Sequence, residues 1–129
     1  MQQSSPEDSF LKISERSHLA GAALSLIIGS SVLMFLIQEM PSFESNYLNS
    51  DKNILGLALM KSVLICVTAT QFFHSALLLW TRKLILSRKN FNRVTTLTAV
   101  NVLAGPHGLL IFLHWIIKGC NAQTKAKFS

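Results

Sequence analysis

Three long stretches of mostly apolar residues contain no Asp, Glu, Lys or Arg. They run from Leu19 to Ile37, from Ser62 to Trp80 and from Thr95 to Ile117, and the second and third contain histidines. Each is about as long as the roughly 20 residues with which a helix crosses the hydrocarbon core of a bilayer. Lipid offers no hydrogen-bond partner for backbone N–H and C=O groups, so such a stretch has to be helical. The pattern predicts an all-α membrane protein with three transmembrane helices, at about 19–37, 62–80 and 95–117.

A soluble three-helix bundle is the alternative explanation for three apolar helices. It would need a charged face on each helix at helical spacing. Here the stretches contain serine, threonine and glycine where soluble helices would carry lysine and glutamate. The whole chain is 50% hydrophobic and only 14% charged, against about a quarter charged in soluble domains. The composition therefore favours the membrane.

The charged residues collect between the predicted spans. The net charge is +6, and five basic residues without any acid separate the second span from the third: Arg82, Lys83, Arg88, Lys89 and Arg93. The first connection is instead acidic, with Glu39, Glu44 and Asp51 against Lys52 and Lys61. The positive-inside rule places the second loop and the N-terminus on the cytoplasmic or matrix side, and three spans then put the C-terminal lysines on the far side. Charge distributed in this way indicates no nucleic-acid partner.

The remaining segments divide the chain into a polar N-terminal tail at 1–18, a three-helix domain at 19–118 and a short polar tail at 119–129. Ser14 and Ser17 are candidate N-caps for the first span. Gly21, Ser25 and Gly29 form a small-residue stripe that lets another helix approach closely. Pro41 is expected to end the first helix, with a loop after it, and Pro106 to kink the third.

Polar residues share one face of the second span. Cys66, Thr70 and His74 recur every four residues, and such a strip should face protein, a cofactor or a cavity instead of lipid. His74 is either a neutral ring bonded to a neighbouring helix or an axial haem ligand, for which imidazole is the usual donor. Helical rise offsets His107 from His74 by about 9 Å, and His114 beside Trp115 suits the interfacial belt. A second haem ligand is therefore expected from another subunit.

These landmarks resemble a known family, the large cytochrome b anchor subunits of succinate dehydrogenase, mitochondrial respiratory complex II. SERSHLAG (Ser14–Gly21) keeps the serine and glycine of the family's first-span motif, PSFESNYL resembles its inter-span loop, and Phe73–His74 resembles the aromatic–histidine pair of its second span. The family's His-Arg pair is replaced by Ser17–His18, and its Gly-x-Arg-His run is absent. The resemblance covers residues 14–118 and is that of a divergent member or a paralogue.

The resemblance implies specific cofactors and partners. His74 would ligate the iron of haem b shared with a second small membrane anchor subunit, and Ser14 and His18 would lie near ubiquinone. The iron–sulfur and flavoprotein subunits would dock on the chain, in the mitochondrial inner membrane.

Two other functions stay open at this point. The chain would be a cofactor-free structural or assembly subunit of a respiratory complex if the stripe at Gly21, Ser25 and Gly29 is its active surface. It would be a self-contained cytochrome if His74 and His107 face each other. No span contains a carboxylate and no nucleophile–base pair is evident. We therefore expect a non-catalytic membrane subunit of a succinate dehydrogenase complex instead of an enzyme acting alone.

Overall fold

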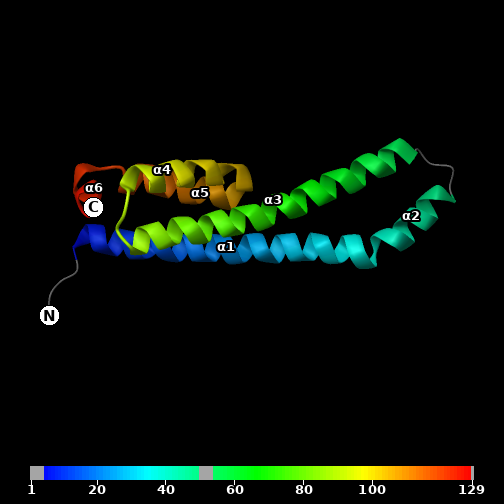
Figure 1. Cartoon of the computed structure of the whole chain (residues 1–129), viewed down its shortest axis with the longest axis horizontal. Coiled ribbons are helices and arrows are strands. Elements are labelled where there is room, and N and C mark those ends of the chain that lie inside the picture. Colours follow the sequence, from blue (N-terminus) through cyan, green and yellow to red (C-terminus); the bar gives the residue numbers. More distant parts are fainter. Residues whose placement is uncertain (1–4, 50–53, 129) are drawn as a thin grey trace.

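The computed structural model describes residues 5–49 and 54–128, and no strand occurs in that part of the chain. Two helices of 33 residues, α1 (Pro6–Gln38) and α3 (Ile54–Leu86), form a long antiparallel pair (Figure 1). The shorter elements are α2 (Met40–Leu48), α4 (Phe91–Val100), the 3-10 helix η1 (Asn101–Ala104), α5 (Pro106–His114), the π-helix η2 (Trp115–Gly119) and α6 (Ala122–Ala126). The fold is all-helical over the described residues.

The first helix begins at Pro6 and not near residue 19. Ser5 caps it, because its backbone is extended and its hydroxyl accepts a hydrogen bond from the backbone N–H of Asp8 at 3.3 Å. Proline is well placed in the first turn, where its missing N–H has no helical partner. The predicted caps Ser14 and Ser17 therefore lie inside the helix. Residues 6–18 of the expected tail belong to α1, whereas residues 1–4 lie outside the described part.

Close backbone approach holds α1 against α3. Gly29 faces Gln71, whose Cβ would lie 3.2 Å from a methyl group placed on the glycine. About one turn further along α3, Ser75 Oγ donates to the carbonyl of Ala22 at 3.0 Å. By length and composition both helices could cross a membrane, since 33 residues extend about 50 Å. Two of the three predicted spans are therefore present as continuous helices.

Pro41 ends the first long helix as expected, but the segment after it is also helical. The bend falls at Glu39, and Pro41 stands in the first turn of α2, where it has no N–H to continue the hydrogen bonding of α1. The predicted loop is therefore helical over Met40–Leu48. Lys61 of α3 forms an ion pair with Glu44 of α2 and ties the two together.

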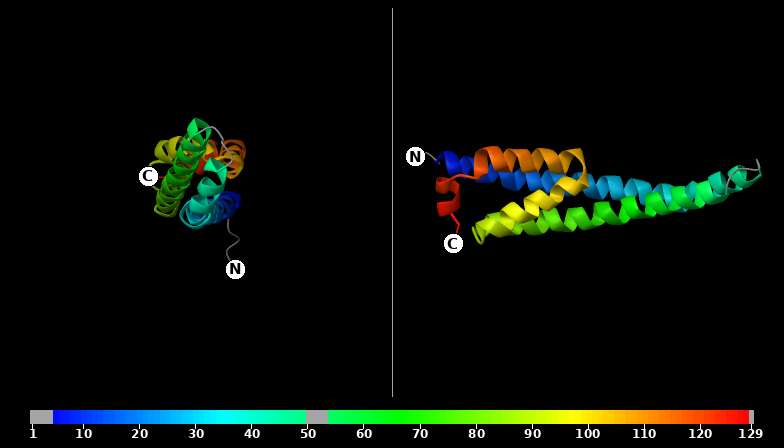
Figure 2. Two further views of the ribbon diagram at one scale, coloured as in Figure 1. Left: turned by 90° about the vertical axis from the view of Figure 1, so that its right-hand side faces the viewer. Right: turned by 90° about the horizontal axis from the view of Figure 1, so that it is seen from above.

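The third predicted span is a helical hairpin instead of one kinked helix. Gly105 adopts φ 109° and ψ −160°, which an L side chain rarely tolerates, and Pro106 then starts a new helix. As a result α5 runs back beside α4 (Figures 1 and 2). The 10 residues of α4 extend only about 15 Å, half the roughly 30 Å of a bilayer core. This segment does not form the continuous third helix that its hydropathy predicts.

The reversal brings both ends of the described chain together. The start of α1, the connection from α3 to α4 and the C-terminal α6 all lie at one end of the molecule (Figure 1). We call this the basic end, because ten of the chain's twelve Lys and Arg residues belong to it. They are Lys12, Arg16, Arg82, Lys83, Arg88, Lys89, Arg93, Lys118, Lys125 and Lys127. The C-terminal lysines thus lie beside the basic loop and not at the opposite end.

An aromatic core fills the basic end. Phe10, Phe91 and Phe128 surround Trp115 with ring centroids 5.6, 5.7 and 6.3 Å from it. Trp115 is fully buried, and its indole N–H donates to Thr95 Oγ1 at 3.0 Å. The interfacial belt predicted for His114 therefore does not include its neighbour Trp115, because the hairpin turns that ring inward. This packing holds the hairpin against α1.

Candidate functional site

Polar side chains line the interface between the hairpin and the long helix pair. Every histidine of the chain belongs to this half of the molecule, together with buried hydroxyl and amide groups from all three sides. The buried polar members are Ser14, His18 and Ser25 of α1, His74, Ser75 and Thr81 of α3, Thr98 of α4 and Asn101 of η1. Of the polar strip predicted on the second span, only His74 is buried against protein, whereas Cys66 and Thr70 are exposed. The prediction that the whole strip faces protein is therefore wrong for those two residues.

The predicted quinone residues are adjacent and completely covered. His18 is 0% exposed, and its Nδ1 donates to the carbonyl of Ser14 at 2.7 Å. Its Nε2 lies 3.4 Å from Thr98 Oγ1 on α4. Ser14 is buried one helical turn earlier. The structure thus brings Ser14 and His18 together beneath α4, where neither lines the cavities that open at the basic end.

The tip of the hairpin is attached to the middle of α1. His107 Nε2 and Ser25 Oγ are 2.9 Å apart. Gly21 lets the hairpin approach, because a methyl group there would lie 2.8 Å from Ile111 Cδ1 and 3.8 Å from His107 Cδ2. The stripe at Gly21, Ser25 and Gly29 therefore contacts α3 and α5 of the same chain. It is not the free partner surface that the structural-subunit hypothesis assumed.

His74 has the orientation of a metal-ligating histidine. Its Nδ1 must donate, because its partner at 2.8 Å is the carbonyl oxygen of Thr70. In the neutral ring Nε2 then carries the lone pair, as in histidines whose other nitrogen is held by a carbonyl. That Nε2 is buried and has no hydrogen-bond partner among residues 5–49 and 54–128. The donor chemistry fits an axial ligand of haem.

In the present fold, however, a porphyrin could not reach Nε2 of His74. His74 is only 3% exposed. The Nε2 of His107, the other candidate ligand, is bonded to Ser25. No group of three or more His, Cys, Asp or Glu side chains suited to a metal occurs in the described part of the chain. A haem at His74 would require the protein around the ring to open, and the pairing of His74 with His107 finds no support here.

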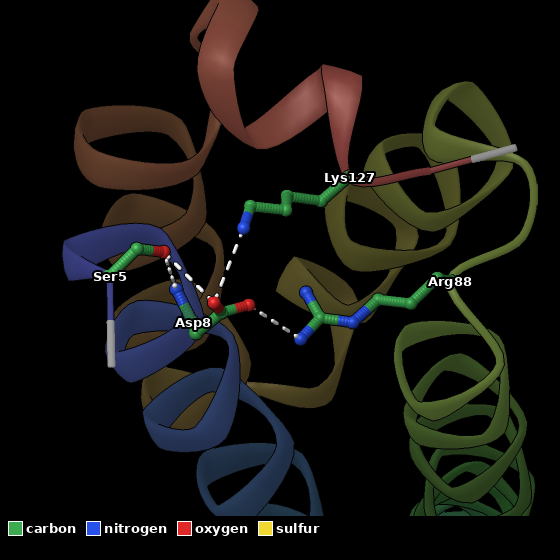
Figure 3. A network of polar contacts seen from close by, with 4 residues as sticks. All are labelled: Ser5, Asp8, Arg88 and Lys127. Atoms are coloured by element: carbon green, nitrogen blue, oxygen red, sulfur yellow. Dashed lines mark hydrogen bonds and ion pairs between the residues drawn. The ribbon is translucent and has the colours of Figure 1, made fainter. Parts of the chain in front are cut away.

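Charged side chains connect three segments at the basic end. The carboxylate of Asp8 accepts hydrogen bonds from Ser5 Oγ at 2.9 Å, from Arg88 at 3.2 Å and from Lys127 at 3.2 Å (Figure 3). Arg88 lies on the connection from α3 to α4, and Lys127 follows α6. One acidic side chain in the first turn of α1 therefore connects the hairpin's entrance to the C-terminal segment.

Two buried residues were missed by sequence reasoning. Thr98 and Asn101 are fully buried on the inner face of the hairpin. Both polar atoms of the Asn101 side chain lack a hydrogen-bond partner within the described residues. Their spacing, with Thr95, puts polar groups at every third position from 95 to 101, a signal that this face packs against protein.

Comparison of the chain with protein-family models, with curated proteins and with solved structures gives no match in any of the three. Function is therefore inferred from the residues and their geometry.

Proposed function

We propose that the chain is a membrane-anchoring subunit of a succinate:quinone oxidoreductase, placed in the mitochondrial inner membrane. Two features support the proposal. The motifs at Ser14–Gly21, at PSFESNYL and at Phe73–His74 resemble the large anchor subunit of that complex. In addition, α1 and α3 are long apolar helices of the kind that an anchor needs.

The observation that carries the anchor function is the separation of charge from apolar surface. The basic residues cluster at one end, while the outer faces of the helices expose aliphatic side chains. On the hairpin, Leu103, Leu110 and Ile117 are 77%, 67% and 77% exposed at seven-residue spacing. We interpret the hairpin as a re-entrant element with its lipid-facing side apolar and its polar side against α1 and α3. Broken helices are tolerated at membrane depth where protein covers them.

The basic end is the proposed docking face. By the positive-inside rule it lies on the matrix side, where the flavoprotein and iron–sulfur subunits would sit. Attraction to anionic lipid headgroups is the competing explanation for the same charges. The hairpin covers only half of the α1–α3 pair (Figure 2), and the uncovered half would receive the second small anchor subunit.

A cytochrome role is the finer part of the proposal. The resemblance assigns haem b to His74 and ubiquinone to the neighbourhood of Ser14 and His18. The Nε2 of His74, buried, oriented and unpartnered within the described residues, favours ligation. Both sites are covered in the isolated chain, so binding would depend on a shift of the hairpin when the partner subunits assemble.

A cofactor-free structural subunit is the second candidate. It is favoured by the coverage of His74 and by the packing of His18 against Thr98. In that case the partner surface would be the exposed apolar face of α1 and α3, because the small-residue stripe is occupied.

Affinity purification of the tagged full chain from its native membrane tests both candidates. The anchor proposal expects flavoprotein and iron–sulfur subunits to co-purify, and their absence would end it. A reduced-minus-oxidised spectrum of the same sample should show a b-type band that His74→Ala removes and Cys66→Ser, on the same helix, retains. A complex without the band would exclude the cytochrome role and leave the anchor function.

A further inference from the structure

A cavity of about 470 Å³ opens at the basic end, between the first turns of α1 and the segment from η2 to α6. Its wall has two different halves. Glu7, His114, Lys118 and Thr124 contribute polar groups, and Phe10 and Ile13 contribute apolar surface. The cavity shares no lining residue with the predicted haem and quinone sites.

The polar half holds groups whose bonding is incomplete. The described residues provide no ion-pair partner for Glu7 or Lys118. They also provide no hydrogen-bond partner for the side-chain oxygen of Thr124, which is 1% exposed, or for Nε2 of His114. Buried polar groups in native proteins are nearly always hydrogen-bonded. Both residues line the cavity, so a ligand bound there is a candidate for the missing partner.

The local backbone is also unusual. Lys118 belongs to a π-helix, a rare element that occurs mostly at functional sites. Gly119 of the same turn lies against Phe10, whose Cζ would be 2.6 Å from an added methyl group. The irregular turn thus sets Lys118 at the cavity while Phe10 packs beneath it.

The position of the cavity matches the boundary between lipid tails and headgroups. Ile13 is 53% exposed on its wall, and the apolar stretch of α1 begins only two turns later. Ile117, next to Lys118, is exposed on the outer face of the hairpin. A ligand here would meet aliphatic surface on one side and charged groups on the other.

We propose that this cavity binds the headgroup of phosphatidylethanolamine. The phosphodiester would accept hydrogen bonds from Lys118 and Thr124, the primary ammonium would donate to Glu7 and His114, and an acyl chain would lie along Ile13. A cavity lined by both a carboxylate and a lysine suits a zwitterion better than an anionic headgroup. It also favours ethanolamine over choline, because a quaternary ammonium has no N–H to donate. The site requires only that the chain resides in a bilayer, so it stands independently of the complex II proposal.

Native mass spectrometry of the full chain in detergent, titrated with defined lipids, tests the site. Phosphatidylethanolamine should bind more tightly than phosphatidylcholine or phosphatidylglycerol of the same acyl chains. Lys118→Gln should weaken binding about tenfold, as expected for loss of one charge-assisted hydrogen bond. Glu7→Gln should abolish the preference for ethanolamine over choline. Lys125→Gln, an equal charge change on α6 outside the cavity, should bind like the parent.

Several results would overturn the site. If the parent chain bound ethanolamine and choline lipids equally, the proposed contact between the ammonium and Glu7 would be excluded. Tighter binding of phosphatidylglycerol than of phosphatidylethanolamine would show that basic charge alone attracts the lipid. The same conclusion would follow if Lys125→Gln lost as much affinity as Lys118→Gln. Competition by soluble glycerophosphoethanolamine at the same affinity would show a free ligand instead of a lipid. Circular dichroism checks that each variant is folded. Thr124→Val removes only the buried hydroxyl and is a second variant that should also weaken binding if the assignment is right.

Discussion

Ser25 Oγ lies 2.9 Å from Nε2 of His107, across 82 residues of sequence. The contact joins the middle of α1 to the tip of the hairpin. It accounts for a serine in the first apolar stretch and for a histidine directly after Pro106. Both are paired with each other inside the protein.

Replacement of Ser25 by alanine should therefore loosen the hairpin. His107 would be left without its partner in a part-buried position, which costs about 1–2 kcal/mol. Chemical unfolding in detergent measures the loss. Ser30→Ala removes an exposed serine from the same helix and should change the free energy of unfolding much less. Equal effects of the two substitutions would mean that the Ser25–His107 contact contributes nothing.

Gly119 should tolerate no side chain while Phe10 is present. An added methyl group would lie 2.6 Å from Phe10 Cζ and 2.9 Å from Cε1, and overpacking of this kind costs about 1–3 kcal/mol. This opposes the gain of up to about 1 kcal/mol that alanine brings inside a helix. Gly119→Ala should destabilise the parent chain but not a Phe10→Leu variant. Identical changes in both backgrounds would contradict the contact.

His74 and His18 should respond oppositely to replacement by leucine in the isolated chain. Nε2 of His74 is buried without a partner among the described residues, so removal of that nitrogen should raise the free energy of unfolding by about 1 kcal/mol. His18 has a contact at each ring nitrogen, and its replacement should lower stability. A large destabilisation by His74→Leu would indicate a partner or ligand that the structure lacks.

The two long helices were largely predictable, because an uncharged stretch of about 20 residues has few alternatives. The early start of α1 was not. Glu15 and Arg16 interrupt the hydropathy, and Glu15 is in fact paired with Arg82 of α3. The buried positions Phe10, Leu11, Ser14 and His18 continue the helical period, but polar residues at two of them conceal it.

The hairpin could not be predicted from hydropathy. Residues 95–117 are long and apolar enough for one span, and Gly105–Pro106 is compatible with either a kink or a reversal. The choice depends on the φ of Gly105 and on partners far away in sequence, such as Ser25. The coverage of His74 follows from the same reversal, so its surroundings were not predictable from hydropathy.

If the chain lies in a bilayer, the reversal puts both ends of the chain on the same side of it. The chain's own cysteines can test this prediction. Cys120 is exposed at the basic end and Cys66 lies on the outer surface of α3. Full-length single-cysteine variants in oriented vesicles would be treated with a membrane-impermeant maleimide. The parent Cys120 (with Cys66→Ser) is compared with Lys12→Cys and Ser42→Cys, each in a background without Cys66 and Cys120.

The hairpin fold predicts that Cys120 reacts from the same side as the cysteine introduced at Lys12, and that only the one introduced at Ser42 reacts from the opposite side. Labelling of Cys120 together with the Ser42→Cys variant would mean that residues 91–119 cross the bilayer. That result would contradict the re-entrant hairpin and the single basic end, and would match the three spans that the hydropathy predicts.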